Sequence, residues 1–346
     1  YGGKTRAVEK SSKVKSRVIA NALRHLMAQA TNIFIMGHEV PDLDSIGAAM
    51  GIYRCARHLD KTAYIIEGAD SSSIVYLMEK ILREDEYKYA FIDGERALER
   101  VDHKSLLVVV DTHRPSFTEM PKLIEKVGGV VVIDHHRRST EMIKNPVLSY
   151  LEPYASSTSE LVTEIVQYFD DRVRLNDIEA NALLAGITMD TKNFTFKTGV
   201  RTFEAASYLR RRGADPTAIR QLLQDNMKAY IARAETVKNA VVIEEGIVMS
   251  ESPEGAENAP LIAAQAADTL LTIHGIHTSF VLSKRSDHIL ISGRSMGNVN
   301  VQIVLEKLGG GGHLTIAGAQ LKNIGMEKAR AKLIEALTEY LEEGDR

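Results

Sequence analysis

Residues 33–44, which read IFIMGHEVPDLD, decide how this chain folds. The first four, Ile33–Met36, are all apolar, as in a strand that is buried on both faces. His38, Asp42 and Asp44 follow directly, so polar groups gather where the predicted strand ends. In open α/β sheets, ligands bind outside the carboxyl ends of the strands. The stretch therefore predicts an α/β fold with a ligand site at one edge of the sheet.

Two further apolar runs end in the same kinds of residue. Leu106–Val110 is followed by Asp111, and Val130–Ile133 is followed by Asp134-His135-His136. Helical patterns lie between the runs, which favours a parallel sheet with crossover helices. Asp190 comes at the end of one of these predicted helices. We expect the side chains that follow the strands to meet at a single edge of the sheet.

These acids and histidines are candidate ligands for two divalent cations. Imidazole nitrogens together with carboxylate oxygens suit Mn²⁺ and, less exclusively, Fe²⁺, Co²⁺ or Mg²⁺. Asp42 and Asp44 point in opposite directions in an extended chain and can serve different ions, with Asp111 placed to bridge them. His135 and Asp190 can complete the coordination of the second ion. Each motif alone has a plainer interpretation, because Asp-x-Asp after proline is also typical of a turn or a helix cap.

The composition excludes several classes of protein. With 346 residues, 44% of them apolar, the chain is long enough for two domains with sizeable cores. A formal net charge of -3 argues against a large basic surface for long nucleic acid. The single cysteine, Cys55, excludes an internal disulfide framework and favours a reducing compartment. We see no apolar stretch long enough to span a bilayer.

A second domain is predicted from about Ala240, and it contains a glycine-rich segment. Four consecutive glycines at Gly309–Gly312 are typical of a flexible linker. However, His313 follows directly, and glycine lets backbone N–H groups approach a phosphate closely. Arg294 can add a bidentate donor, or it can be a surface ion-pair partner. The predicted phosphate-binding residues are Arg294, Gly310, Gly311, Gly312 and His313.

The motifs resemble those of the DHH phosphoesterase superfamily. The matching residues in the first domain are His38-x-x-x-Asp42-x-Asp44, Asp111, Asp134-His135-His136 and Asp190. Gly309–His313, followed by Ala317-Gly318-Ala319, is similar to the glycine-rich signature of the DHH-associated second domain. The resemblance implies an α/β fold of two domains. These are a parallel-sheet DHH domain with flanking helices and a smaller mixed-sheet α/β DHH-associated domain, with the active site in the cleft between them.

The resemblance also implies a role for each residue. The expected ligands are His38 and Asp42 for the first Mn²⁺ and Asp44, His135 and Asp190 for the second, with Asp111 bridging. His136 would be catalytic with Asp111 and face the substrate phosphate. Asp134 would orient a histidine, because metal-bound imidazoles usually donate their other N–H to an acceptor.

Finer features are similar to the GdpP/YybT class of membrane-anchored cyclic-di-AMP phosphodiesterases. The matching stretches are Pro41–Ala48, Val110–Ser116 and Ser292–Ser295. The implied reaction opens cyclic di-AMP to linear 5′-pApA by water that two metal ions activate. The chain starts at Tyr1 rather than methionine, so we expect a cytoplasmic module of a longer protein anchored in the bacterial cell membrane. A homodimer, with ppGpp as a regulatory nucleotide, is the further expectation.

We divide the chain into four parts. Residues 1–16 are a linker from a preceding region, 17–215 the DHH catalytic domain, 216–239 a helical connector, and 240–346 the substrate-binding domain. One alternative function is a short-oligonucleotide exonuclease or nucleotide phosphatase of the same superfamily. Another is a non-catalytic sensor that binds a dinucleotide, and metal-dependent turnover separates it from the enzymes.

Overall fold

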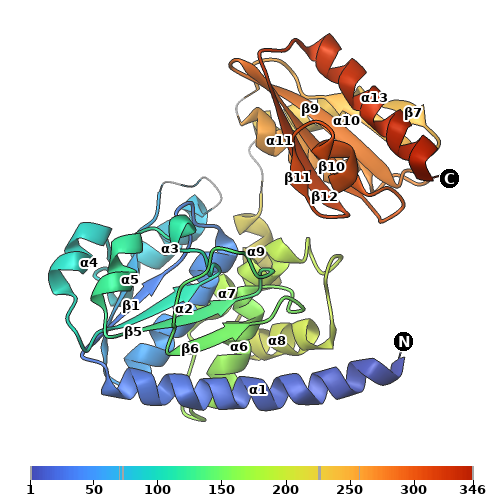
Figure 1. Ribbon diagram of the computed structural model, residues 1–346. Helices are drawn as coiled ribbons and strands as arrows, with labels where there is room; N and C mark the ends of the chain where they lie inside the picture. The colour runs from blue at the N-terminus through green and yellow to red at the C-terminus, as the bar shows by residue number, and fades with distance from the viewer. Residues whose placement is uncertain (1, 70, 72–73, 225–226, 257, 345–346) are drawn as a thin grey trace. The chain divides into compact units, whose positions relative to one another are not determined.

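The computed structural model describes residues 2–69, 71, 74–224, 227–256 and 258–344. They form two compact units, Tyr1–Gln224 and Asp225–Arg346 (Figure 1). The first contains a parallel sheet, and the second, which is the smaller unit, contains a mixed sheet, each with helices. The predicted fold class, two successive α/β domains of these kinds, is confirmed.

The first sheet has six parallel strands in the order β3-β2-β1-β4-β5-β6. Their bounds are β1 Asn32–Met36, β2 Thr62–Ile66, β3 Phe91–Ile92, β4 Leu106–Val110, β5 Gly129–Asp134 and β6 Leu148–Leu151. Both faces of the central strands are buried, since alternate residues of β4 pack into two separate apolar clusters. This burial explains why β1, β4 and β5 read as continuous apolar runs.

Helices cover both faces of this sheet. Their bounds are α1 Gly2–Gln29, α2 Leu43–His58, α3 Val75–Leu82, α4 Gly94–Arg100, α5 Pro121–Lys126, α6 Thr158–Phe169, α7 Asp177–Asp190, α8 Val200–Arg211 and α9 Pro216–Leu222. Helices α2, α6 and α7 belong to the larger apolar cluster, and α4 and α5 belong to the smaller one. Helix α1 runs alongside α6 (Figure 1) and buries Leu23 and Met27.

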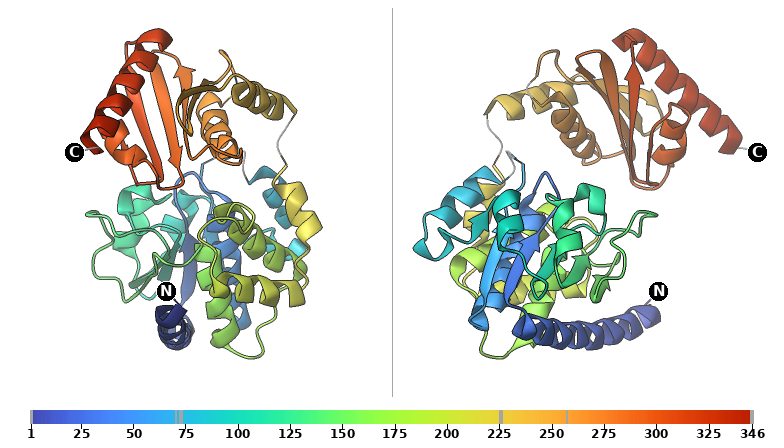
Figure 2. Two further views of the ribbon diagram at one scale, coloured as in Figure 1. Left: turned by 90° about the vertical axis from the view of Figure 1, so that its right-hand side faces the viewer. Right: turned by 60° about the vertical axis from the view of Figure 1, so that its left-hand side comes forward.

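The second sheet also has six strands, in the order β11-β12-β10-β9-β8-β7, and only the β8–β9 pair is parallel within the described residues. The strand bounds are β7 Val241–Glu244, β8 Ile247–Glu251, β9 Thr278–Arg285, β10 His288–Ser295, β11 Gly311–Gly312 and β12 Ile316–Lys322. The helices are α10 Met227–Lys238, α11 Ala259–Leu270, α12 Val301–Glu306 and α13 Met326–Gly344. Helices α11 and α13 lie on opposite faces of the sheet (Figure 2), each with its own apolar cluster.

The structure differs from the sequence analysis in several local features. From Gly2 onward, the segment expected to be a linker is the first part of α1, and the expected connector is divided between α9 and α10. The apolar runs of the sequence correspond to β1, β4 and β5, whereas the edge strands β3, β6 and β11 have no such run. None of the helices in the described ranges is long and apolar enough to cross a membrane.

Candidate metal centre

The order of strands in the first sheet explains where the polar residues gather. From β1 the chain moves outward to β2 and β3, and it then returns to the other side of β1 with β4. The chain therefore leaves β1 and β4 toward opposite sides, and the carboxyl ends of two such strands are where open α/β sheets bind ligands. His38, Asp42 and Asp111 follow these two strands. The first predicted ligands thus lie at the switch point of the sheet.

Asp42 is both the N-terminal cap of α2 and part of the acidic cluster. Its Oδ1 accepts the backbone N–H groups of Asp44 (2.9 Å) and Ser45 (3.0 Å). The same oxygen lies 3.7 Å from the Nε2 of His38. The cap fixes the orientation of the carboxylate, because it satisfies two otherwise unpaired donors of the first helical turn.

Asp44 is held by the beginning of another helix. It is 0% exposed, and its two oxygens accept the backbone N–H groups of Thr158 (2.7 Å) and Ser159 (2.8 Å) at the start of α6. A helix N-terminus favours negative charge, so this contact holds a buried carboxylate in place. Gly186 of α7 allows the close packing, because a Cβ there would lie 2.8 Å from the Cα of Asp44. Burial, together with the carboxylates of Asp111 and Asp190, raises the pKa of Asp44 well above its usual range.

Asp111 occupies the centre of the cluster in a strained conformation. Its φ is +60°, a left-handed value that residues other than glycine seldom adopt, and such strain is concentrated at functional sites. The side chain is 2% exposed, and its Oδ1 accepts the hydroxyl of Thr158 (3.0 Å). One oxygen lies 3.3 Å from Nε2 of His38, and the other lies 3.6 Å from Nε2 of His135. Burial raises the pKa of Asp111, although the hydrogen bond from His38 opposes this.

His135 gives the clearest sign that a cation belongs here. The ring is buried, and both of its nitrogens lack a hydrogen-bond partner of acceptable geometry. Nε2 nevertheless lies 3.1 Å from Asp190 and 4.0 Å from Asp44. Burial disfavours the charged ring, but these carboxylates outweigh it and raise the pKa of His135 to about 10. Buried nitrogens without hydrogen bonds, facing several carboxylates, are the donor set that Mn²⁺ and similar ions prefer.

The candidate ligand atoms fall into overlapping groups. Within each group, one nitrogen or oxygen from every residue lies within 4.8 Å of the others. The groups are His38, Asp42 and Asp111; Asp44, His135 and Asp190; and Asp111, His135 and His136. The structure thus brings together all six predicted metal ligands. The roles assigned to them stay predictions, as do the identity and number of the ions.

His136 lies on the exposed side of the cluster. Its side chain is 55% exposed, and its Nδ1 lies 2.8 Å from Oδ1 of Asp134. The other oxygen of Asp134 contacts Nδ1 of His113. Asp134 therefore pairs with His136 and His113, whereas the sequence had predicted only that it orients a histidine. His113 had been quoted within a motif and given no role. The signal that could have indicated one is a histidine two residues after the acid that ends a strand.

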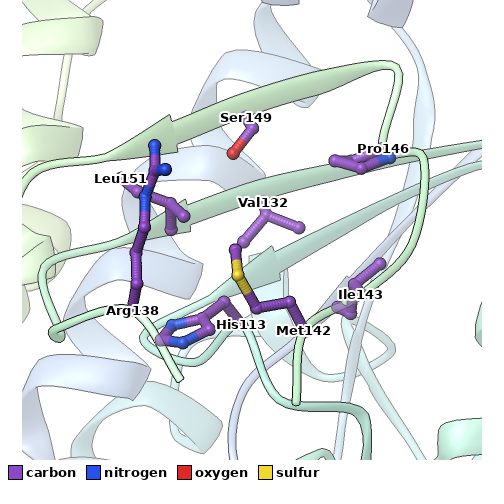
Figure 3. Close-up of a pocket in the computed structure, with 8 residues that line it drawn as sticks. All are labelled: His113, Val132, Arg138, Met142, Ile143, Pro146, Ser149 and Leu151. Atoms are coloured by element: carbon purple, nitrogen blue, oxygen red, sulfur yellow. The ribbon is translucent and has the colours of Figure 1, made fainter. Parts of the chain in front are cut away.

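A cavity of about 220 Å³ lies beside His113. Figure 3 shows His113 and Arg138 on one side of it and Ile143 and Pro146 on the other. Its remaining lining is mainly apolar, from Val132, Met142, Ser149 and Leu151. The side chains that form the candidate metal ligands do not line this cavity.

In the second unit the glycine-rich segment forms a hairpin. Gly311 pairs with Gly318 and Gly312 with Ala317, so the segment is part of the sheet. A Cβ on Gly312 would lie 2.4 Å from the Cα of Ala317, whereas one on Gly311 would meet nothing within 4 Å. The interpretation as a flexible linker is therefore wrong. His313 is exposed at the end of this hairpin.

Arg294, on the neighbouring strand, is already engaged within the second unit. Its Nε donates to Oδ1 of Asp268 (3.0 Å), and its Nη1 donates to the carbonyl of Gly293 (3.0 Å). The ion-pair alternative for Arg294 is thus present in the structure. The predicted contact with a substrate phosphate stays a prediction.

Comparison with known proteins identifies both domains. Residues 32–187 match the DHH family N-terminal domain, and residues 239–343 match the DHHA1 domain. The chain belongs to the DHH family, as the motifs had indicated. Asp111, His135 and the residues of the loop after β1 all lie within the first match.

Two curated relatives are similar over almost the whole chain. The cyclic-di-AMP phosphodiesterase GdpP of Geobacillus thermodenitrificans is 46% identical over 99% of this chain and 53% of its own length. The cyclic-di-AMP phosphodiesterase PdeA of Listeria monocytogenes is 45% identical over 98% of this chain and 52% of its own length. The chain therefore spans about half the length of these relatives.

A solved structure supports the fold. An exopolyphosphatase-related protein from Bacteroides fragilis has a TM-score of 0.77 and 20% sequence identity, and the match covers 93% of this chain and 96% of that one. At this identity the likeness shows the arrangement of elements and says nothing about the reaction.

Proposed function

We propose that this chain is the catalytic module of a phosphodiesterase that hydrolyses cyclic di-AMP to linear 5′-pApA. The observation that carries the proposal is the position of Asp111, which belongs both to the group with His38 and Asp42 and to a group with His135. An acid shared by neighbouring ligand groups is what a pair of metal ions requires. The relatives that match the chain at 45–46% identity are cyclic-di-AMP phosphodiesterases.

In the first domain, some of the residues would hold metal and others would contact the substrate. When bound, two divalent ions, Mn²⁺ by preference, supply Lewis-acid stabilisation of the phosphate and lower the pKa of water. His38, Asp42 and Asp111 would hold one ion, and Asp44, His135 and Asp190, with Asp111, would hold the other. His136 keeps its Nδ1 on Asp134, so its Nε2 is the nitrogen available to a phosphate oxygen. A hydrogen bond there would stabilise charge that develops in the transition state.

The second domain would bind the remaining phosphate and sugar groups of the dinucleotide. The proposed contacts are Arg294, Gly310, Gly311, Gly312 and His313. Two observations support this role. His313 is exposed, and the space beside the backbone of Gly311, where a side chain would lie, is open.

A turnover assay tests the proposal. Cyclic di-AMP, linear diadenylate and cyclic di-GMP are offered side by side with Mn²⁺, with EDTA as the metal-free control. We expect rapid, EDTA-sensitive opening of cyclic di-AMP and slower cleavage of the linear product. Preferential conversion of the linear dinucleotide to mononucleotide would instead assign the chain to the oligonucleotide-degrading branch. Binding of cyclic di-AMP without turnover would identify a sensor.

Three further properties belong to the same proposal. We propose that the active protein is a homodimer, that ppGpp competes with the substrate, and that the parent protein is anchored in the bacterial cell membrane. Sedimentation of the purified chain tests the first, and ppGpp titrated into the turnover assay tests the second. Membrane fractionation of the full-length parent tests the third.

A further inference from the structure

His113 is a buried histidine whose two nitrogens are both engaged. Its Nε2 accepts the backbone N–H of Ser139 (3.0 Å). A nitrogen that accepts carries no proton, so in this ring the proton is on Nδ1. That nitrogen donates to Oδ2 of Asp134, 2.5 Å away. The two neighbours therefore fix both the tautomer and the orientation of His113.

Asp134 links this ring to His136. It is fully buried, and its Oδ1 accepts the backbone N–H (3.0 Å) and the Nδ1–H (2.8 Å) of His136. Burial disfavours the charged form, but the hydrogen bonds from His113 and His136 outweigh it and lower the pKa of Asp134. The carboxylate is thus shared between one buried histidine and one exposed histidine. A buried acid of this kind sets which nitrogen of its histidine carries the proton.

We propose that His113 is a positioning residue that acts through Asp134 on His136. Its donation to Oδ2 holds the carboxylate in the rotamer whose other oxygen faces His136. That rotamer keeps His136 protonated on Nδ1 and directs its Nε2 outward. Without the donor, a buried anionic oxygen would lose its partner, which is costly, and the carboxylate would rotate toward another donor. The inference rests on the proposed function only for the task of His136 at the substrate phosphate.

The same histidine also fixes the segment that follows His136. In addition to the Ser139 contact, the backbone carbonyl of His113 accepts the N–H of Ile143 (2.8 Å). Residues 136–143 are therefore attached to His113 at two points. The bond from Ile143 is to the backbone, so substitution of the side chain leaves it in place, and it is the Ser139 contact that must be separated experimentally from the contact with Asp134.

Two substitutions separate the two contacts. The amide of His113→Asn can donate from close to the position of Nδ1, and so keeps the bond to Asp134 while losing the acceptor for Ser139. The amide oxygen of His113→Gln reaches the position of Nε2, and so keeps the bond from Ser139 while losing the donor to Asp134. His103→Gln, which changes an exposed histidine of the same domain, is the matched control.

We expect His113→Gln to lower kcat by about 10–100-fold, the usual cost of losing a group that orients a functional side chain. KM should change little, because the loss concerns the transition state. His113→Asn should restore most of kcat, and His103→Gln should match the wild type. Equal kcat in the Asn and Gln variants, or loss of kcat only in the Asn variant, would overturn the proposal.

A second measurement does not depend on turnover. Nitrogen NMR of histidine-labelled protein reports which ring nitrogen of His136 carries the proton. We expect Nδ1–H in the wild type and in His113→Asn, and a mixture of tautomers in His113→Gln. An unchanged tautomer in His113→Gln overturns the role of His113, even if the wild type turns over no cyclic dinucleotide and the proposed function fails. If His113→Gln does not fold, loss of the Nδ1–H form in His113→Asn would be the contradicting result.

Discussion

Two groups of buried carboxylates in the first domain differ in what balances their charge. Glu160 and Glu164 of α6 lie beside Arg201, whose Nε and Nη2 donate to the two oxygens of Glu164 at 2.7 Å each. Among the residues that the structure describes, by contrast, the ion pairs of Asp44 and Asp111 are with histidines alone. Acids that pair with an arginine of the same fold stabilise it. Acids that pair only with titratable histidines create a site for an external cation. Three predictions test this difference, and a fourth concerns the second domain.

The largest effect is expected from Asp111→Asn. Asparagine tolerates the left-handed backbone at this position, so the domain should fold. It removes the shared carboxylate charge, and we expect kcat for cyclic di-AMP to fall by well over the ~10–100-fold that follows loss of an orienting group. Steady-state kinetics with Mn²⁺ provide the measurement, and Asp171→Asn, an exposed acid in the same domain, is the control. Wild-type turnover in Asp111→Asn would show that the acid is structural.

Arg201→Met is expected to affect stability instead. The arginine side chain is 13% exposed, and its removal leaves Glu164 buried without its cation. Breaking a buried pair in this way costs about 3–5 kcal/mol of the free energy of unfolding. Calorimetry should show a lower melting temperature, and Arg172→Met, which breaks an ion pair whose arginine is 82% exposed, should melt close to the wild type. Equal melting temperatures for the two variants would show that Arg201 does not stabilise the fold through Glu160 and Glu164.

Adding Mn²⁺ should stabilise the protein through the cluster that contains Asp44 and Asp111. At a free ion concentration of 100 times Kd, binding to the folded state adds about 2.7 kcal/mol. We expect the melting temperature to rise in the wild type and in Arg201→Met by similar free energies, and to rise far less in Asp111→Asn. An equal rise in Asp111→Asn would place the bound ion elsewhere.

The smallest effect is expected for a pair of neighbouring glycines in the second domain. Gly312 has φ +153° and no room for a Cβ, so Gly312→Ala should destabilise the hairpin. Gly311 has open space, so Gly311→Ala should melt like the wild type. If the hairpin binds phosphate, Gly311→Ala should raise KM by roughly tenfold, or about 1.4 kcal/mol of binding. An unchanged KM would mean that this glycine serves neither folding nor substrate binding.

Some contacts of the candidate site could not be predicted from local sequence motifs. The sequence Ser157-x-x-Glu160 is typical of a capping box, and Ser157 does cap α6. Glu160, however, accepts the hydroxyls of Ser156 and Thr202 rather than closing the box. Thr158 and Ser159 hold Asp44 across more than a hundred residues of sequence, and neither has a chemical signature that marks it for this role.

The sequence by itself determined which residues reach the edge of the sheet. Apolar runs that end in an acid or a histidine are local patterns, and parallel strands bring their ends together whatever the details of packing. Only the tertiary structure decided which atoms face each other there. The register of β4 and β5 pairs Val110 with Ile133, so the chain that leaves β4 runs beside Asp134 and brings His113 to it. Contacts of this kind depend on register, helix packing and strained turns such as that at Asp111, which no single segment of sequence encodes.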